Sequence, residues 1–92
     1  MPQVFKIGAY IVYFWIHEGF PLEPIHVHVA EGTPTQNATK IWITQTGKCL
    51  VSSNSSRIPE RQLRIIMDVV EARHKEIEDL WIEKFGAIAY YC

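Results

Sequence analysis

The chain has 92 residues, of which 48% are hydrophobic and 21% are charged, and its formal net charge is −1. This length suits one domain rather than two, so we expect a single domain over residues 1–92. The near-neutral charge argues against a dedicated nucleic-acid-binding module, because such modules are strongly basic. Cys49 and Cys92 form neither a CxxC motif nor a disulfide framework, which favours a reducing, cytoplasmic location.

The first half of the sequence predicts β-structure. Residues 4–17 carry apolar side chains at both alternating sets of positions, which is typical of a central strand covered on both faces. The stretch 7–16 is too short to span a membrane, which needs about 20 apolar residues, so we expect no membrane association. Further strands are predicted over about 25–31, 38–46 and 49–53, the last two joined as a hairpin. The sequence therefore predicts a small antiparallel sheet of three to four strands.

The second half predicts helix. After Pro59, apolar residues recur at spacings of three, four and seven, the pattern of an amphipathic helix over about 59–85. This is long for one globular helix, so we expect it to bend near 72–74 or to break into two. Gly86 is a candidate C-cap, and the apolar tail 86–92 either closes the core or docks on another subunit. The predicted fold class is α+β, with the helix packed on one face of the sheet.

Four segments carry a resemblance to a known family: YFWIHEG, EPIHVHVAEGTPTQNATKIWI, GKCLVSSNSSRIPERQLRII and WIEKFG. Over roughly residues 8–86 the chain resembles the small bacterial domain-of-unknown-function family 4160. The most specific segment is 24–29, PIHVHV, which resembles the family's Pro-x-His-x-His-x signature. The resemblance implies a compact cytoplasmic bacterial protein, and for some members a place in a toxin–antitoxin-like gene pair, but no activity. The resemblance implies that His26 and His28 are the site residues of the signature. The loop that contains His17 departs from the family pattern, so the resemblance does not extend to His17.

The histidine pair is the first candidate site. His26 and His28 are spaced i, i+2, so both side chains project from one face of a strand. Two imidazoles so placed can share a divalent transition metal if further ligands complete the shell, although no cofactor is firmly implied. The candidates for those ligands are His17, Glu18 and His74, with Glu23 and Glu31 as further possibilities.

The alternative for this pair is structural, and we favour it. Both rings would then lie on a half-exposed face, hydrogen-bonded and packed beside Trp42 or Tyr13. His74 is more typical of a helix-surface or packing residue.

The second candidate site is an arginine stripe. Arg57, Arg61 and Arg64 lie around the start of the predicted helix, where the helix dipole favours acidic residues. Beside the segment SSNSS they could bind phosphate, nucleic acid or an acidic partner. The alternative, which we favour, is a solvated basic face partly neutralised by Glu60 and Asp68.

The sequence contains no GxSxG, no HExxH and no glycine-rich phosphate loop. We therefore expect a non-enzymatic interaction or regulatory protein with a protein partner or self-association. Its expected binding residues are His26, His28, Trp42, Arg57, Arg61 and Arg64. A metal-binding protein or metal-dependent enzyme using the two histidines is the first alternative. Nucleic-acid binding through the three arginines is the second and is not favoured.

Overall fold

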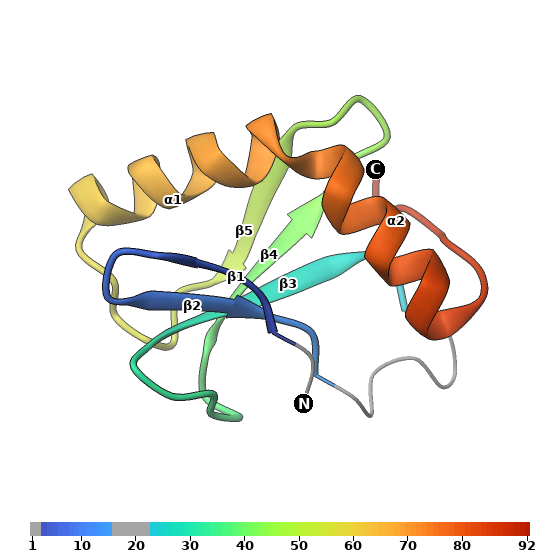
Figure 1. Ribbon diagram of the computed structural model, residues 1–92. Helices are drawn as coiled ribbons and strands as arrows, with labels where there is room; N and C mark the ends of the chain where they lie inside the picture. Colours follow the sequence, from blue (N-terminus) through green and yellow to red (C-terminus); the bar gives the residue numbers. More distant parts are fainter. Residues whose placement is uncertain (1–2, 16–22) are drawn as a thin grey trace.

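The computed structural model describes residues 3–15 and 23–92, and within them the chain forms one sheet and two helices (Figure 1). The five strands of the described residues pair antiparallel in chain order. This confirms the α+β class, with one strand more than predicted. The elements are β1 (Gln3–Ile7), β2 (Tyr10–Tyr13), β3 (His26–Glu31), β4 (Thr39–Ile43), β5 (Cys49–Ser53), α1 (Glu60–Ala72) and α2 (His74–Phe85).

The prediction of one strand over 4–17 was wrong, because the chain reverses at Gly8. Ile7 pairs with Tyr10, so Gly8 and Ala9 form a two-residue hairpin turn between β1 and β2. Gly8 has φ of 58°, and a positive φ at the first of two turn residues matches the twist of the flanking strands. The apolar run thus covers two adjacent strands. Residues 16 and 17 lie outside the described residues.

β3 lies at the centre of the sheet and is buried on both faces. It pairs with β2 on one side and with β4 on the other. Ile25, Val27 and Val29 point towards the helices and form the middle of the main core. His26 and His28 share the opposite face, as predicted, and Ala30 lies there with Tyr13.

The two helices lie on the same side of the sheet (Figure 1). The predicted break is confirmed at Arg73, whose φ of −110° and ψ of 22° separate α1 from α2. Gly86 ends α2 in the left-handed conformation with φ of 83°, as predicted for a C-cap. The two helices bury Ile66, Val70, Ile77 and Trp81. No helix among the described residues is long and apolar enough to cross a membrane.

The loop between β5 and α1 is tied to the first residue of β4. Asn54 Oδ1 accepts hydrogen bonds from the Thr39 hydroxyl at 2.6 Å and from the Ile58 N–H at 3.0 Å. Ser56 Oγ accepts from the Thr39 N–H at 3.1 Å and donates to the Val29 carbonyl. Arg57 lies between Ser56 and Ile58, which both make these hydrogen bonds, and its φ is 55°. Hydrogen bonds of the Ser- and Asn-rich segment therefore join β3 and β4 to the loop that leads into α1.

The C-terminal tail lies against the chain's own sheet. The Ala89 carbonyl accepts a hydrogen bond from the Ile25 N–H at 2.8 Å, and the Cys92 carbonyl accepts one from the Gln45 N–H at 3.0 Å. These bonds place the tail beside the start of β3 and the end of β4. Of the two expectations for the tail, the structure shows docking on its own domain.

Trp81 provides a test of the packing between helix and sheet. Its ring is 1% exposed and lies 5.3 Å from the ring of Phe14 and 5.4 Å from that of His26. We expect Trp81→Ala to lower the free energy of unfolding by about 3–5 kcal/mol, because it leaves a large cavity. Trp81→Phe should cost less than half as much, since the indole N–H has no acceptor among the described residues. Urea denaturation measures both; equal losses would contradict this account.

Candidate functional site

The histidine pair, His26 and His28, lies in the interior of the molecule. His26 is 1% exposed and His28 is 8% exposed, so the expectation of a half-exposed face was wrong. Their expected neighbours are confirmed. The His28 ring stacks on Tyr13 at 5.7 Å, and the His26 ring meets Trp42 edge-on at 5.5 Å. Little of either imidazole is therefore accessible to a macromolecular partner.

A row of aromatic rings follows from the strand register. Tyr13 on β2 pairs with His28 on β3, and His26 pairs with Trp42 on β4. Directly paired residues point to the same face, so these side chains lie together on the sheet face opposite the helices. The two histidine rings are 5.1 Å apart. The row is Trp15, Tyr13, His28, His26, Trp42 and Tyr91, each ring within 6.4 Å of the next.

Polar contacts fix this row at several points. The Tyr13 hydroxyl donates to the Thr35 carbonyl at 2.7 Å and accepts from the Thr35 N–H at 3.0 Å. His26 Nδ1 lies 2.8 Å from the Pro24 carbonyl oxygen. A carbonyl can only accept, so the proton of the neutral ring is assigned to Nδ1 and Nε2 is the acceptor. The tautomer of His26 is thus set by its own strand.

The row reaches solvent at one end, which we call the Trp42 patch and define as Lys40, Trp42, Leu50 and Tyr91. Tyr91 is 59% exposed and stacks on Trp42 at 4.9 Å, with 7° between the ring planes. Leu50 is 46% exposed and pairs with Trp42 across β4 and β5. Lys40 Nζ lies 4.4 Å from the Trp42 ring centroid, a cation–π contact, and 3.4 Å from Glu23 Oε1.

Sequence reasoning identified Trp42 but missed Leu50 and Tyr91. The apolar tail was the only signal for Tyr91. No local sequence pattern predicts that Tyr91 packs against Trp42 on β4.

The described residues hold no complete metal shell. Among residues 3–15 and 23–92, no group of three or more His, Cys, Asp or Glu side chains could hold a metal ion. His17 and Glu18, two of the predicted ligands, lie outside the described residues. The third, His74, begins α2 and faces the turn between β4 and β5 instead. The metal hypothesis is therefore confined to His26 and His28 in this part of the chain.

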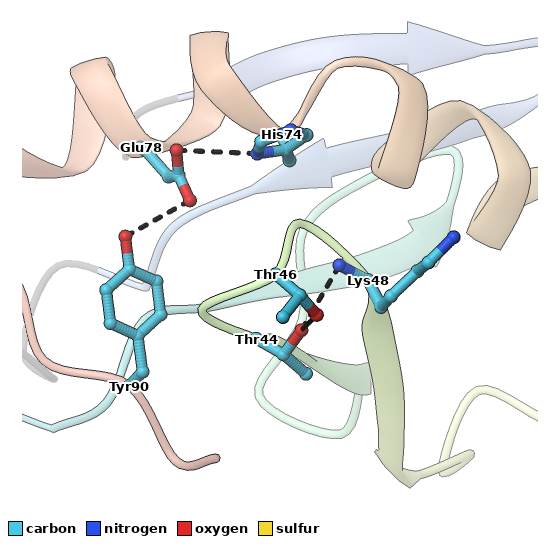
Figure 2. A network of polar contacts seen from close by, with 6 residues as sticks. All are labelled: Thr44, Thr46, Lys48, His74, Glu78 and Tyr90. Carbon is cyan, nitrogen blue, oxygen red and sulfur yellow. Dashed lines mark hydrogen bonds and ion pairs between the residues drawn. The ribbon is translucent and has the colours of Figure 1, made fainter.

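His74 belongs to a separate polar network shown in Figure 2. Its Nδ1 lies 3.4 Å from Glu78 Oε1, and Glu78 Oε2 accepts a 3.1 Å hydrogen bond from the Tyr90 hydroxyl. Burial raises the pKa of Tyr90, and the adjacent Glu78 carboxylate adds to that rise. Below this network, Thr44 Oγ1 accepts from the Lys48 N–H at 3.1 Å and shapes the turn. The His74–Glu78–Tyr90 contacts thus join α2 to the tail.

The three predicted binding arginines are exposed but do not form a purely basic face. Arg57 lies in the loop, while Arg61 and Arg64 lie on α1. Arg64 pairs with Glu60 at 3.6 Å, and Asp68 lines the same surface hollow. A phosphate at this place would meet carboxylates as well as guanidinium groups, which weakens its attraction. This mixture of charges agrees with the alternative favoured from the sequence, a solvated basic face partly neutralised by Glu60 and Asp68.

Cys49 is the first residue of β5 and is buried. Burial, followed by the charge of Glu71 and the hydrogen bond to it, raises the pKa of the Cys49 thiol to about 12. The thiolate is the reactive form of cysteine, so Cys49 is chemically inert near neutral pH. Cys92 is exposed.

The fold and this site define a small α+β protein with helices on one face of its sheet and an ordered aromatic row on the other. The chain belongs to the family described as domain of unknown function (DUF4160), whose model matches residues 9–82. This match runs from the β1–β2 turn into α2 and confirms the resemblance noted in the sequence. No curated protein and no solved structure matches the chain.

The contact between the turn and His74 can be tested at Gly47. A Cβ added at Gly47 would lie 2.7 Å from His74 Nε2, and the φ of Gly47 is +82°. We expect Gly47→Ala to cost roughly 2–4 kcal/mol of unfolding free energy, from the positive φ and from displacement of the ring. Gly8→Ala is the matched control, because Gly8 also has a positive φ but an open surrounding, and should cost only about 1 kcal/mol.

The double variant Gly47→Ala/His74→Ala separates the two contributions to this cost. Relative to His74→Ala, it should lose no more stability than Gly8→Ala loses relative to the parent. Thermal or urea unfolding measures all four variants. A Gly47→Ala cost equal to that of Gly8→Ala would contradict the contact.

Thiol labelling tests the environment of Cys49. With a pKa of about 12, roughly one Cys49 thiol in 10,000 is ionised at pH 8. A chromogenic disulfide reagent should therefore label one thiol of the folded protein rapidly and the second slowly, with fast labelling of both only after denaturation. Cys92→Ser should abolish the rapid phase. The slow labelling rate should rise about tenfold per pH unit while the protein stays folded, because the thiolate fraction rises by that factor. Two equally fast thiols would refute the assignment.

Proposed function

We propose that the protein is a small non-enzymatic interaction module whose partner binds the Trp42 patch. The observation that carries the proposal is the stack of the exposed Tyr91 on the half-buried Trp42, with the exposed Leu50 beside it. Exposed aromatic side chains that adjoin an aliphatic one are typical of protein-binding surfaces. Tryptophan and tyrosine are also enriched among the residues that contribute most to binding energy.

The patch is held in position before any partner arrives. Backbone hydrogen bonds from Ile25 and Gln45 fix the tail that carries Tyr91. Trp42 contacts Tyr91 stacked upon it and His26 edge-on, and Lys40 lies over its ring. A surface whose side chains are already ordered loses less conformational entropy on binding, which favours affinity.

The two histidines act in this proposal through the patch. His26 is too buried to form an interface, but its ring contacts both Trp42 and Trp81. It therefore links the patch to the core on the helix side of the sheet. His28 continues the row to Tyr13, which the Thr35 backbone holds. The signature strand is thus a positioning element for the surface that a partner contacts.

The family resemblance supports one class of partner, the product of an adjacent gene in a toxin–antitoxin-like pair. Such a partner would present an apolar cavity or groove to the flat Trp42–Tyr91 stack. The metal-dependent alternative has less support, because the described residues supply only the histidine pair as candidate ligands.

Purification from the native host with two matched variants tests the proposal. Leu50→Lys introduces a charge into the patch, whereas Ile82→Lys introduces the same charge at a similarly exposed residue of α2. We expect a stoichiometric partner with the parent and with Ile82→Lys. Recovery should fall at least about tenfold with Leu50→Lys, because an apolar interface would have to desolvate the ammonium group.

Circular dichroism and unfolding curves of both variants control for folding. The proposal fails if the parent recovers no stoichiometric protein. It also fails if both lysine variants, each folded, lose the partner to the same extent.

A further inference from the structure

The charges on α1 run against its helix dipole. Arg61 and Arg64 lie in the N-terminal half, Asp68 lies in the C-terminal half, and the last turn has no basic residue. A helix is stabilised by acidic groups near its N-terminus and basic groups near its C-terminus. Glu60 in the first turn is an exception, and it pairs with Arg64. The outer face of α1 therefore has a basic half and an acidic half whose order the helix itself does not favour.

The same face is shaped as a ridge between two grooves. Glu60, Arg64 and Asp68 are spaced by four residues and line both of the surface hollows on α1. Leu63, Met67 and Glu71 complete one hollow of about 320 Å³. Arg61 and Ile65 complete the other, of about 520 Å³. Rows of residues four apart form the ridges that fit into grooves of a neighbouring helix, so this surface has the shape of a helix-packing face.

We infer that the outer face of α1 binds the α1 helix of a second copy of this chain in antiparallel orientation. A two-fold axis at the level of Ile66 sets Arg64 of each copy opposite Asp68 of the other. The basic half of each helix then faces the acidic half of its neighbour. Both copies use the same surface, as a closed two-fold interface requires.

Ile65 supplies an apolar contact at this axis. It is 47% exposed and lies one residue from the level of the axis. With a rise of about 1.5 Å per residue, the two Ile65 side chains lie roughly 3 Å apart along the helices and can touch. α1 has 13 residues, so the contact is about 20 Å long. An interface of this size, supported by exposed ion pairs, makes a weak and salt-sensitive dimer.

This surface is separate from the Trp42 patch. α1 covers the opposite face of the sheet, so a dimer through α1 leaves the patch free (Figure 1). The inference does not depend on the proposed function. It also explains why Arg61 and Arg64 alternate with acidic residues instead of forming a phosphate-binding stripe.

Charge reversal with mixing tests the inference. Arg64→Glu places two carboxylates opposite each other in its own dimer, and Asp68→Arg places two guanidinium groups opposite each other. We expect sedimentation velocity between about 10 µM and 1 mM to show parent dimers that dissociate as salt rises from about 50 to 500 mM. Each single variant should raise the dimer dissociation constant at least about tenfold. Lys84→Glu, an exposed reversal on α2, should leave it unchanged.

An equimolar mixture of Arg64→Glu and Asp68→Arg chains gives the deciding result. Opposite charges now meet in the mixed pair, so dimers should return to within about threefold of the parent constant. The double variant Arg64→Glu/Asp68→Arg should also recover. Because the mixture contains the same folded chains, misfolding cannot produce this recovery. If a single variant does not fold, Ile65→Lys must weaken the parent dimer instead.

Three results would overturn the inference. The first is a parent chain that stays monomeric at about 1 mM in low salt. The second is a mixture that associates no better than its components. The third is an Ile65→Lys chain that is folded and dimerises as well as the parent.

Discussion

The arrangement of the molecule depends on the burial of β3 on both faces. One set of its side chains packs against the helices, and the other set joins the aromatic row. Side chains alternate strictly along a strand, so a slip of one residue would exchange the two sets. The histidine rings would then enter the aliphatic core, and Val27 and Val29 would face Tyr13 and Trp42. This constraint fixes the register of β2 and β4 and, through Trp81, the position of α2.

Histidine suits its place in the row because it combines a flat ring with a polar edge. At His26 the edge bonds the Pro24 carbonyl while the ring contacts Trp42, His28 and Trp81. A leucine or phenylalanine of similar size would fill the space but could not satisfy that carbonyl. A buried carbonyl without a partner costs free energy comparable to a lost hydrogen bond. His26 thus has a structural reason to be polar although little of it reaches solvent.

The break at Arg73 gives the two helices different roles. α2 carries Trp81 onto the start of β3, and its Glu78 receives the Tyr90 hydroxyl of the tail. α1 packs beside β5 and leaves a charged outer face exposed. A single straight helix could not meet both ends of so small a sheet. The break therefore lets α1 pack beside β5 while α2 packs over the start of β3.

The sequence alone determined the features that depend on local geometry. The alternation of residues 25–31 predicted which side chains of β3 share a face, and the change of period after Pro59 predicted the helices. The break near residues 72–74 and the cap at Gly86 also followed from local signals. The family resemblance over most of the chain was equally readable from its motifs.

Only the tertiary structure decided what covers each face. The hairpin within 3–13 was hidden because two adjacent buried strands and one long strand share the same apolar pattern. The burial of His26 and the stacking of Tyr91 on Trp42 bring together segments far apart in the chain. Periodicity records the direction of a side chain from its own backbone. Its exposure and partners depend on which distant segment packs against it, and that is settled by the whole fold.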